Sequence, residues 1–132
     1  MSGQVKELKS KKIAQLVVVA LEDLKGESIR SIDVQKLTEI TDYMVIVTGR
    51  SSTHIKALAD SVAKKVKEAG LDILGMEGKL QSEWILVDVG GVVVHIMLGS
   101  VRALYNLEDL WSFDASKGAA RAGSAVEPSP DS

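Results

Sequence analysis

Apolar residues recur at the spacing of one helix face in two stretches of the chain. The first runs from Ile13 to Leu24, and Gly26 follows it as a stop signal. The second follows Ser51 and Ser52, either of which can cap a helix N-terminus. Its apolar stripe comprises Ile55, Leu58, Ala59, Val62, Val66 and Ala69, and Gly70 closes it. The pattern predicts two amphipathic helices, each with one buried face.

Shorter apolar runs predict strands between and after these helices. Ile32 and Val34 alternate with polar residues, as in a strand with one wet face. The continuous run 43–47 is typical of a strand covered on both faces. We expect a third strand over Leu71 to Met76, followed by a polar connection over 77–83.

Two further strands are expected over 84–89 and 92–98, because Gly90-Gly91 between two apolar runs is a strong signal for a two-residue hairpin turn. Such a turn fixes the register, and therefore the residues on each face of the hairpin. One face should be pure core, with Val89, Val92, Val87, Val94, Ile85 and Ile96. The other, which we call the mixed face, should hold Asp88, Val93, Leu86, His95, Trp84 and Met97.

The mixed face combines a carboxylate, an imidazole, an indole and a thioether. A tryptophan beside polar groups is typical of a protein-binding surface, since its large ring gains much on desolvation. Alternatively, helices cover this face too, with Asp88 near the edge and His95 bonded to the backbone. The sequence leaves both interpretations open.

The remaining segment predicts a last helix and a tail. Apolar residues from Val101 to Trp111 sit at helical spacings, and Asn106 offers a restart point. Beyond Phe113 the composition shifts to Ala, Gly, Ser and Pro without a period, so we expect disorder there. The order α-β-β-α-β-β-β-α predicts a single α/β domain with a mixed sheet of about five strands packed against helices.

The predicted organisation has three parts. Residues 1–12 form a polar N-terminal extension, 13–114 form the domain, and 115–132 form the tail. A chain of 132 residues, 45% hydrophobic and 26% charged, fits one globular domain. The absence of cysteine excludes a disulfide, a thiolate metal site and a cysteine nucleophile. No apolar run approaches the roughly 20 residues that span a bilayer, and no secretory signal is evident, so we expect a cytoplasmic protein.

The net charge of −2 is unevenly distributed. Residues 1–12 carry four lysines and one glutamate, whereas the tail is neutral, which leaves the domain itself acidic. An acidic domain is poorly suited to gripping nucleic-acid phosphates. It is better suited to a basic protein partner.

A set of segments in a characteristic order carries a family resemblance. They are Ile40–Gly49 with Ser51–His54, Ala59–Val62, Gly75–Gly78, Trp84–Gly90, Val92–Met97, and Arg102, Leu104-Tyr105, Leu107-Glu108 and Leu110-Trp111. In order and spacing, over about Ile13 to Ser112, they resemble the ribosomal silencing factor (Iojap) family.

The resemblance implies a binding protein rather than an enzyme, with a nucleotidyltransferase-like topology but no catalytic carboxylates. It implies docking on the large ribosomal subunit through large-subunit ribosomal protein fourteen, at the face that meets the small subunit. The small subunit is then kept from joining, so that translation is repressed. Little direct RNA contact, no membrane, no cofactor and no metal are expected, and family members tend to be homodimers when free. By position, the partner-binding candidates are Trp84, Asp88, His95, Met97, Arg102, Tyr105 and Glu108.

Two positions depart from the family's usual pattern. Aspartate usually follows Gly90, but this chain has Gly91, and Asn106 replaces a commoner glutamate. The missing carboxylate at position 91 would weaken docking if it contacts the partner. If it is only a turn residue, glycine serves as well or better.

Enzyme functions fit the sequence less well. A nucleotidyltransferase needs a Gly-Ser turn, which Gly49-Arg50-Ser51 imitates, and two carboxylates spaced two residues apart to hold a divalent metal. Neither Asp60 nor Asp88 has such a neighbour. The same turn could bind a phosphate, but it lacks the full P-loop pattern and reads more simply as a capped strand-to-helix turn. Neither histidine has a nucleophile beside it in sequence for Ser-His-Asp chemistry.

Overall fold

The elements follow one another in the predicted order in the computed structural model, which describes residues 2–79 and 82–107. They are α1 (Ser2–Asp23), β1 (Glu27–Asp33), β2 (Tyr43–Gly49), α2 (Ser52–Glu68), β3 (Gly75–Lys79), β4 (Trp84–Asp88), β5 (Val92–Leu98) and α3 (Gly99–Tyr105). The α/β fold class is confirmed.

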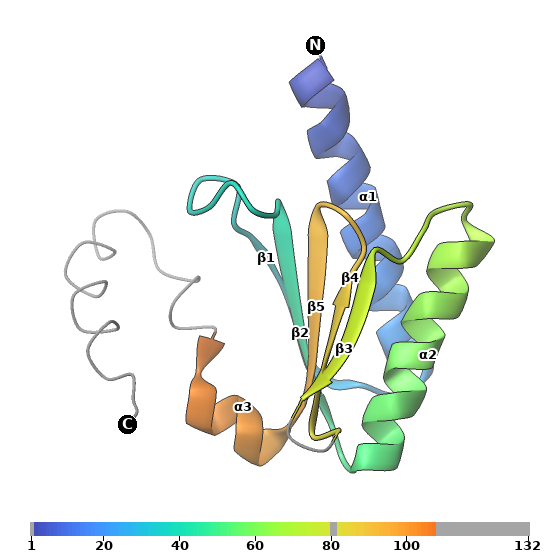
Figure 1. The fold of residues 1–132 in the computed structure, drawn as a ribbon, viewed down its shortest axis with the longest axis vertical. Coiled ribbons are helices and arrows are strands. Elements are labelled where there is room, and N and C mark those ends of the chain that lie inside the picture. The colour runs from blue at the N-terminus through green and yellow to red at the C-terminus, as the bar shows by residue number, and fades with distance from the viewer. Residues whose placement is uncertain (1, 80–81, 108–132) are drawn as a thin grey trace, which may run out of the picture.

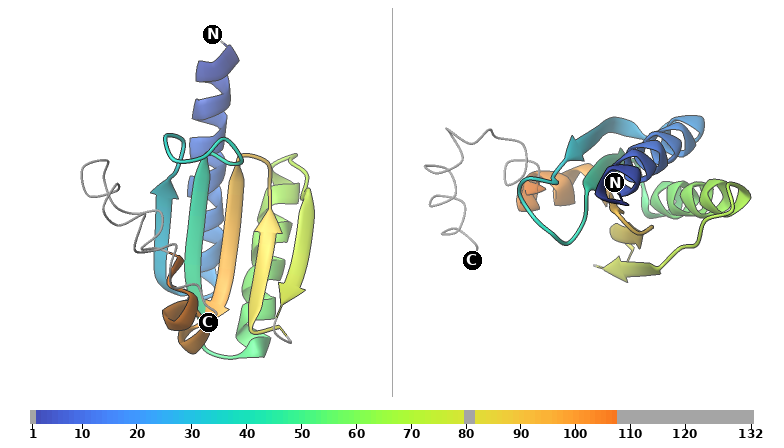
Figure 2. Two further views of the ribbon diagram at one scale, coloured as in Figure 1. Left: turned by 60° about the vertical axis from the view of Figure 1, so that its left-hand side comes forward. Right: turned by 90° about the horizontal axis from the view of Figure 1, so that it is seen from above.

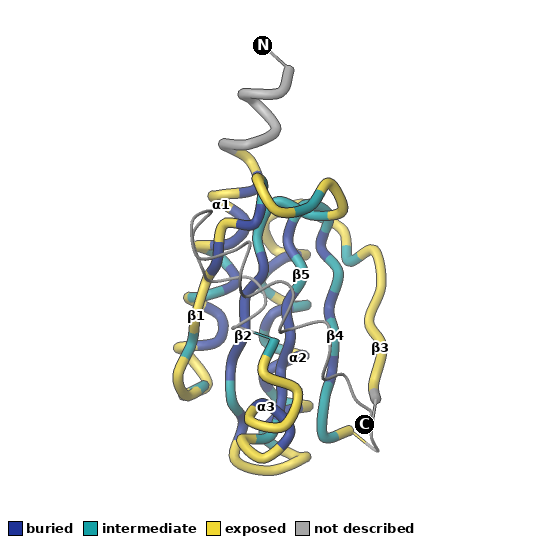
Figure 3. The backbone as a smooth tube through the Cα atoms, turned by 90° about the vertical axis from the view of Figure 1, so that its left-hand side faces the viewer, coloured by how far each residue is buried: buried dark blue, intermediate teal, exposed yellow. Residues whose placement is uncertain are grey.

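The five strands form one mixed sheet in the order β1-β2-β5-β4-β3. Strands β2 and β5 are parallel, and the other three pairs are antiparallel. Helices α1 and α2 cover one face of the sheet, and α3 lies against the other (Figures 1 and 2). Viewed from the side of α3, the central strands are buried and the edge strand β3 is exposed (Figure 3).

The main core lies between the sheet and the two long helices. Its helical side includes the predicted stripe of α2, apart from the exposed Ala69. Its sheet side includes the six hairpin residues predicted to be pure core, and all six are buried. Burial of such aliphatic side chains, at about 25 cal/mol per Å² of apolar surface, is the main force that holds the layers together.

The predicted hairpin register is confirmed. Trp84 pairs with Met97, Leu86 with His95, and the backbone N–H of Val89 donates to the carbonyl of Val92 at 2.9 Å. Gly90 and Gly91 have φ values of +79° and +80°, the conformation for which glycine is favoured in tight hairpin turns.

A second, smaller core lies on the opposite face of the sheet. It consists of Ile32, Val34, Met44, Ile46, Met97 and Val101. Because α3 and the β1 end supply part of this cluster, β2 is buried on both faces, as predicted from its continuous apolar run.

Two boundaries differ from prediction. Helix α1 begins at Ser2 rather than near Ile13, so residues 2–12 are helical; lysine, glutamine and glutamate are good helix formers that need no apolar stripe. Strand β3 spans Gly75–Lys79 rather than 71–76, because it follows its pairing with β4, from Gly75 opposite Asp88 to Lys79 opposite Trp84. The apolar residues before it, Leu71 and Ile73, pack against the main core as part of the connection.

Candidate partner-binding surface

Trp84, at the start of β4, is held between two other rings. Its indole N–H donates to Nδ1 of His95 at 3.1 Å, and the two ring centroids are 5.8 Å apart. On its other side the centroid of Tyr105 lies 5.0 Å away, with the planes tilted by 50°. Tilted aromatic pairs at this spacing are favourable beyond their burial. The indole therefore has a fixed position on the mixed face.

Three elements bring these rings together. His95 lies one pairing step along the hairpin from Trp84, on the same face of the sheet, and Tyr105 comes from the last turn of α3. His95 is 9% exposed, so its side chain is a support beneath the indole. Since its Nδ1 accepts the indole hydrogen bond, the neutral ring carries its proton on Nε2.

The exposed part of this region is on α3. Tyr105 is 46% exposed and Leu104 is 76% exposed, whereas Trp84 is half-buried. We call Trp84, Leu104 and Tyr105 the aromatic patch. Exposed aromatic and aliphatic side chains beside a fixed indole are typical of the centre of a protein interface.

Leu104 was missed as a site residue by the sequence analysis. Its spacing from Val101 indicated a buried helix face, but the described helix is only seven residues long and buries Val101 and Arg102 instead. No signal in the sequence distinguishes the two arrangements.

Two expected contact residues are buried in the domain's own structure. Met97 has no exposed surface and belongs to the second core, where Trp84 packs against it. Arg102 is 8% exposed, and its Nη1 donates to the carbonyl of Ser28 at 2.7 Å and to Oγ1 of Thr48 at 2.9 Å. We therefore correct both assignments: Met97 and Arg102 support the surface and hold α3 on the sheet, rather than being presented to a partner.

Asp88 closes the hairpin end of the mixed face. Its Oδ1 accepts from the backbone N–H of Gly90 at 3.0 Å, and the side chain remains half-exposed. It can therefore shape the turn and still meet a partner with its second oxygen. Glu108, the remaining candidate, lies outside the described residues.

The departure at Gly91 has a local explanation. A Cβ at this position would lie 2.4 Å from Oγ of Ser10 and 3.5 Å from a carboxylate oxygen of Asp42. Ser10 is buried on α1 and donates to Asp42 at 2.7 Å. With a φ of +80° as well, glycine is the residue that this turn accommodates without displacing Ser10.

The strand-to-helix turn after β2 is occupied by its own chain. Ser51 caps α2 by accepting from the N–H of His54 at 3.1 Å. The N–H of Arg50 donates to Nδ1 of His54 at 2.9 Å, and Nε2 of that ring donates to the carbonyl of Leu24 at 2.8 Å. These contacts confirm a capped turn, in which His54 is a capping neighbour that ties α1 to α2.

The possible metal ligands do not gather in the described part of the chain. Asp60 lies on α2 and Asp88 on β4, and no group of three or more His, Cys, Asp or Glu residues there could hold a metal ion. Among the same residues, no helix combines the length and apolarity needed to cross a membrane.

Comparison with known proteins identifies the family. Residues 7–131 match the family model described as ribosomal silencing factor during starvation. A ribosomal silencing factor of Chromobacterium violaceum is 49% identical over 117 residues, which cover 86% of this chain and 96% of the relative. The corresponding protein of Bacillus subtilis is 34% identical over 104 residues, covering 79% of this chain and 88% of the relative.

More distant relatives and solved structures agree with this assignment. A mouse protein named mitochondrial assembly of ribosomal large subunit protein 1 is 34% identical over 105 residues, covering 75% of this chain and 46% of its own length. A crystal structure of a Chromobacterium violaceum protein superposes with a TM-score of 0.74 at 46% identity, covering 83% of this chain and 97% of that one. The chain belongs to the ribosomal silencing factor family.

Proposed function

We propose that this protein represses translation by docking on the large ribosomal subunit and occupying space that the small subunit needs. The docking partner is large-subunit ribosomal protein fourteen, at the face between the subunits. The aromatic patch is the centre of the contact. The action is stoichiometric binding and involves no chemical step.

The single observation that carries this proposal is the fixed position of Trp84 between His95 and Tyr105. An indole already held in place loses little conformational freedom on binding, so more of its desolvation energy becomes affinity. Leu104 extends the same surface with a large exposed apolar side chain. Interface energy concentrates in such aromatic anchors.

The charge of the chain favours a basic protein as the partner. The whole chain carries 18 acidic and 16 basic residues, and four of the lysines lie in residues 1–12. On the mixed face, Asp88 lies at the hairpin end and Glu77 lies opposite Leu86 on β3. Acidic groups at the rim of an interface steer a basic partner to it.

A steric mechanism needs only an interface of ordinary size. Stable protein interfaces bury roughly 1,200–2,000 Å² in total, and the sheet face with α3 offers one side of such a contact. Names of relatives support the target, since the mouse relative is named for the large ribosomal subunit. The free chain is proposed to be a homodimer, which sedimentation equilibrium can test.

Co-sedimentation with purified ribosomal subunits tests the proposal. The protein should pellet with large subunits and stay in the supernatant with small subunits alone. Prior addition of excess free ribosomal protein fourteen should keep it in the supernatant. Equal pelleting with both subunits, or no effect of the competing protein, would contradict the proposed partner.

A further inference from the structure

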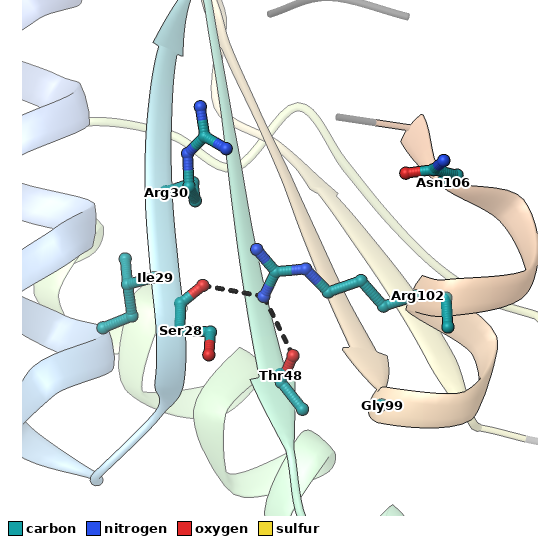
Figure 4. A pocket seen from close by; sticks show the side chains of 8 residues that line it. Ser28, Ile29, Arg30, Thr48, Gly99, Arg102 and Asn106 are labelled. Carbon is teal, nitrogen blue, oxygen red and sulfur yellow. Dashed lines mark hydrogen bonds between the residues drawn. The ribbon is translucent and has the colours of Figure 1, made fainter. Parts of the chain in front are cut away.

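A pocket of about 460 Å³ lies between β1, β2 and α3, beside the aromatic patch but not part of it (Figure 4). Its polar lining includes Arg30 from β1, Thr48 from β2, and Arg102 and Asn106 from α3 and its end. The volume falls in the range of about 300–1,000 Å³ that is usual for small-molecule sites. The pocket also lies at the carboxyl ends of the two parallel strands, the usual place for ligands in α/β sheets.

The lining of this pocket is basic. Arg30 and Arg102 contribute two guanidinium groups, and none of the lining residues is acidic. Glu27, the acidic residue that precedes the pocket on β1, pairs with Arg50 at 3.6 Å. In a chain with more acidic than basic residues, two arginines around one hollow without a carboxylate create a local positive potential.

Arg102 is held in a fixed orientation within the pocket. Its side chain extends from α3 toward β1 and β2 (Figure 4), where one nitrogen bonds both the Ser28 carbonyl and the Thr48 hydroxyl. Ser28 has a φ of +49° and lies at the irregularity of β1 between Glu27 and Arg30. A strained residue at a bulge costs about 1–3 kcal/mol and commonly marks a site where a side chain must be aimed.

We propose that this pocket binds the phosphate group of a small phosphorylated molecule. Guanidinium groups match phosphate through paired N–H···O bonds, and a rigidly held arginine loses little freedom in making them. The apolar lining residues Ile29 and Ala103 offer a wall for the rest of the ligand. A terminal phosphate can enter such a recess end-on, whereas a backbone phosphate of RNA is flanked by sugars on both sides.

Titration calorimetry tests the site without ribosomes. The probes are inorganic phosphate and a nucleoside 5′-monophosphate, with the unphosphorylated nucleoside as the neutral control. We expect saturable binding of both phosphate probes and none of the nucleoside. Arg30→Gln should weaken binding about tenfold or more, as the loss of a charged hydrogen-bonding partner does. Arg50→Gln removes the same charge outside the pocket lining and should leave the affinity within about twofold.

Amide chemical shifts then locate the bound phosphate. The N–H signals of Thr48, Gly99 and Asn106 should move on titration, and that of Gly70, at the end of α2, should not. Arg30 is exposed, so its variant should fold normally, which a thermal unfolding curve checks. The proposal is overturned by absent or non-saturable binding, by equal losses in the two arginine variants, or by shifts centred elsewhere. It is also overturned if a short RNA binds and free phosphate does not compete with it.

Discussion

The indole N–H of Trp84 donates to Nδ1 of His95 across 3.1 Å, between diagonal neighbours on the two strands of the hairpin. The bond sets the tautomer of one ring and the orientation of the other. With Tyr105 on the opposite side, the indole is fixed before any partner arrives. This pre-organised anchor is the physical basis of the proposed docking surface.

Replacing Trp84 tests the anchor. Trp84→Ala should weaken large-subunit binding by about 2 kcal/mol or more, roughly 30-fold, because interface tryptophans carry a large share of binding energy. Trp84→Phe keeps a ring against Tyr105 but removes the bond to His95, and should lie between the two. Affinity is measured by sedimentation and folding by circular dichroism. A folded alanine variant that binds normally would place Trp84 outside the interface.

Leu104 provides a probe that leaves the fold unchanged. Since it is 76% exposed, Leu104→Ala should not alter thermal unfolding but should weaken large-subunit binding about fivefold or more, the value of one buried leucine side chain at about 1 kcal/mol or above. Val19→Ala, on the exposed side of α1, is the matched control and should bind like the wild type. Equal losses in both variants would argue against the aromatic patch.

The acidic rim should act on the rate of association. Asp88→Asn keeps an oxygen for the N–H of Gly90, and so removes charge without removing the turn bond. This variant and Glu108→Gln should each bind more slowly, with a larger difference at low salt because screening weakens long-range attraction. Stopped-flow association at several ionic strengths measures this. A loss that is the same at every salt concentration would indicate packing instead of charge.

The Gly91 turn and Ser10 should be energetically coupled. Gly91→Asp introduces a Cβ that collides with Oγ of Ser10, and should destabilise the fold by about 1–3 kcal/mol. Ser10→Ala removes that atom, so the double variant should be more stable than the sum of the single changes predicts. Denaturant unfolding of all four proteins measures the coupling. Strict additivity would mean that the two positions do not share the space.

The sequence predicted the fold wherever one local signal decided the structure. Gly90-Gly91 fixed the hairpin register, and with it the two faces of β4 and β5. The 3.6-residue period of α2 predicted its buried side. These features depend on neighbours along the chain, so no long-range information was needed.

The candidate site was predicted only in part, because burial on the mixed face depends on distant segments. Met97 is buried by Ile32 and Val101, and Arg102 by contacts with β1 and β2. Neither set of contacts leaves a periodic trace near the residue concerned. Trp84 was found because a tryptophan beside polar groups is a local signal, whereas Leu104 was not, because its spacing indicated the core.

Light scattering of purified subunits during association tests the central claim most directly. Inhibition of subunit joining should rise with the ratio of protein to large subunits and be complete near one to one, with no nucleoside triphosphate present. Ser51→Ala should inhibit equally, although loss of the α2 cap costs about 1 kcal/mol of stability. If substoichiometric protein instead prevents all joining, and only when a triphosphate is added, the steric binding account is contradicted.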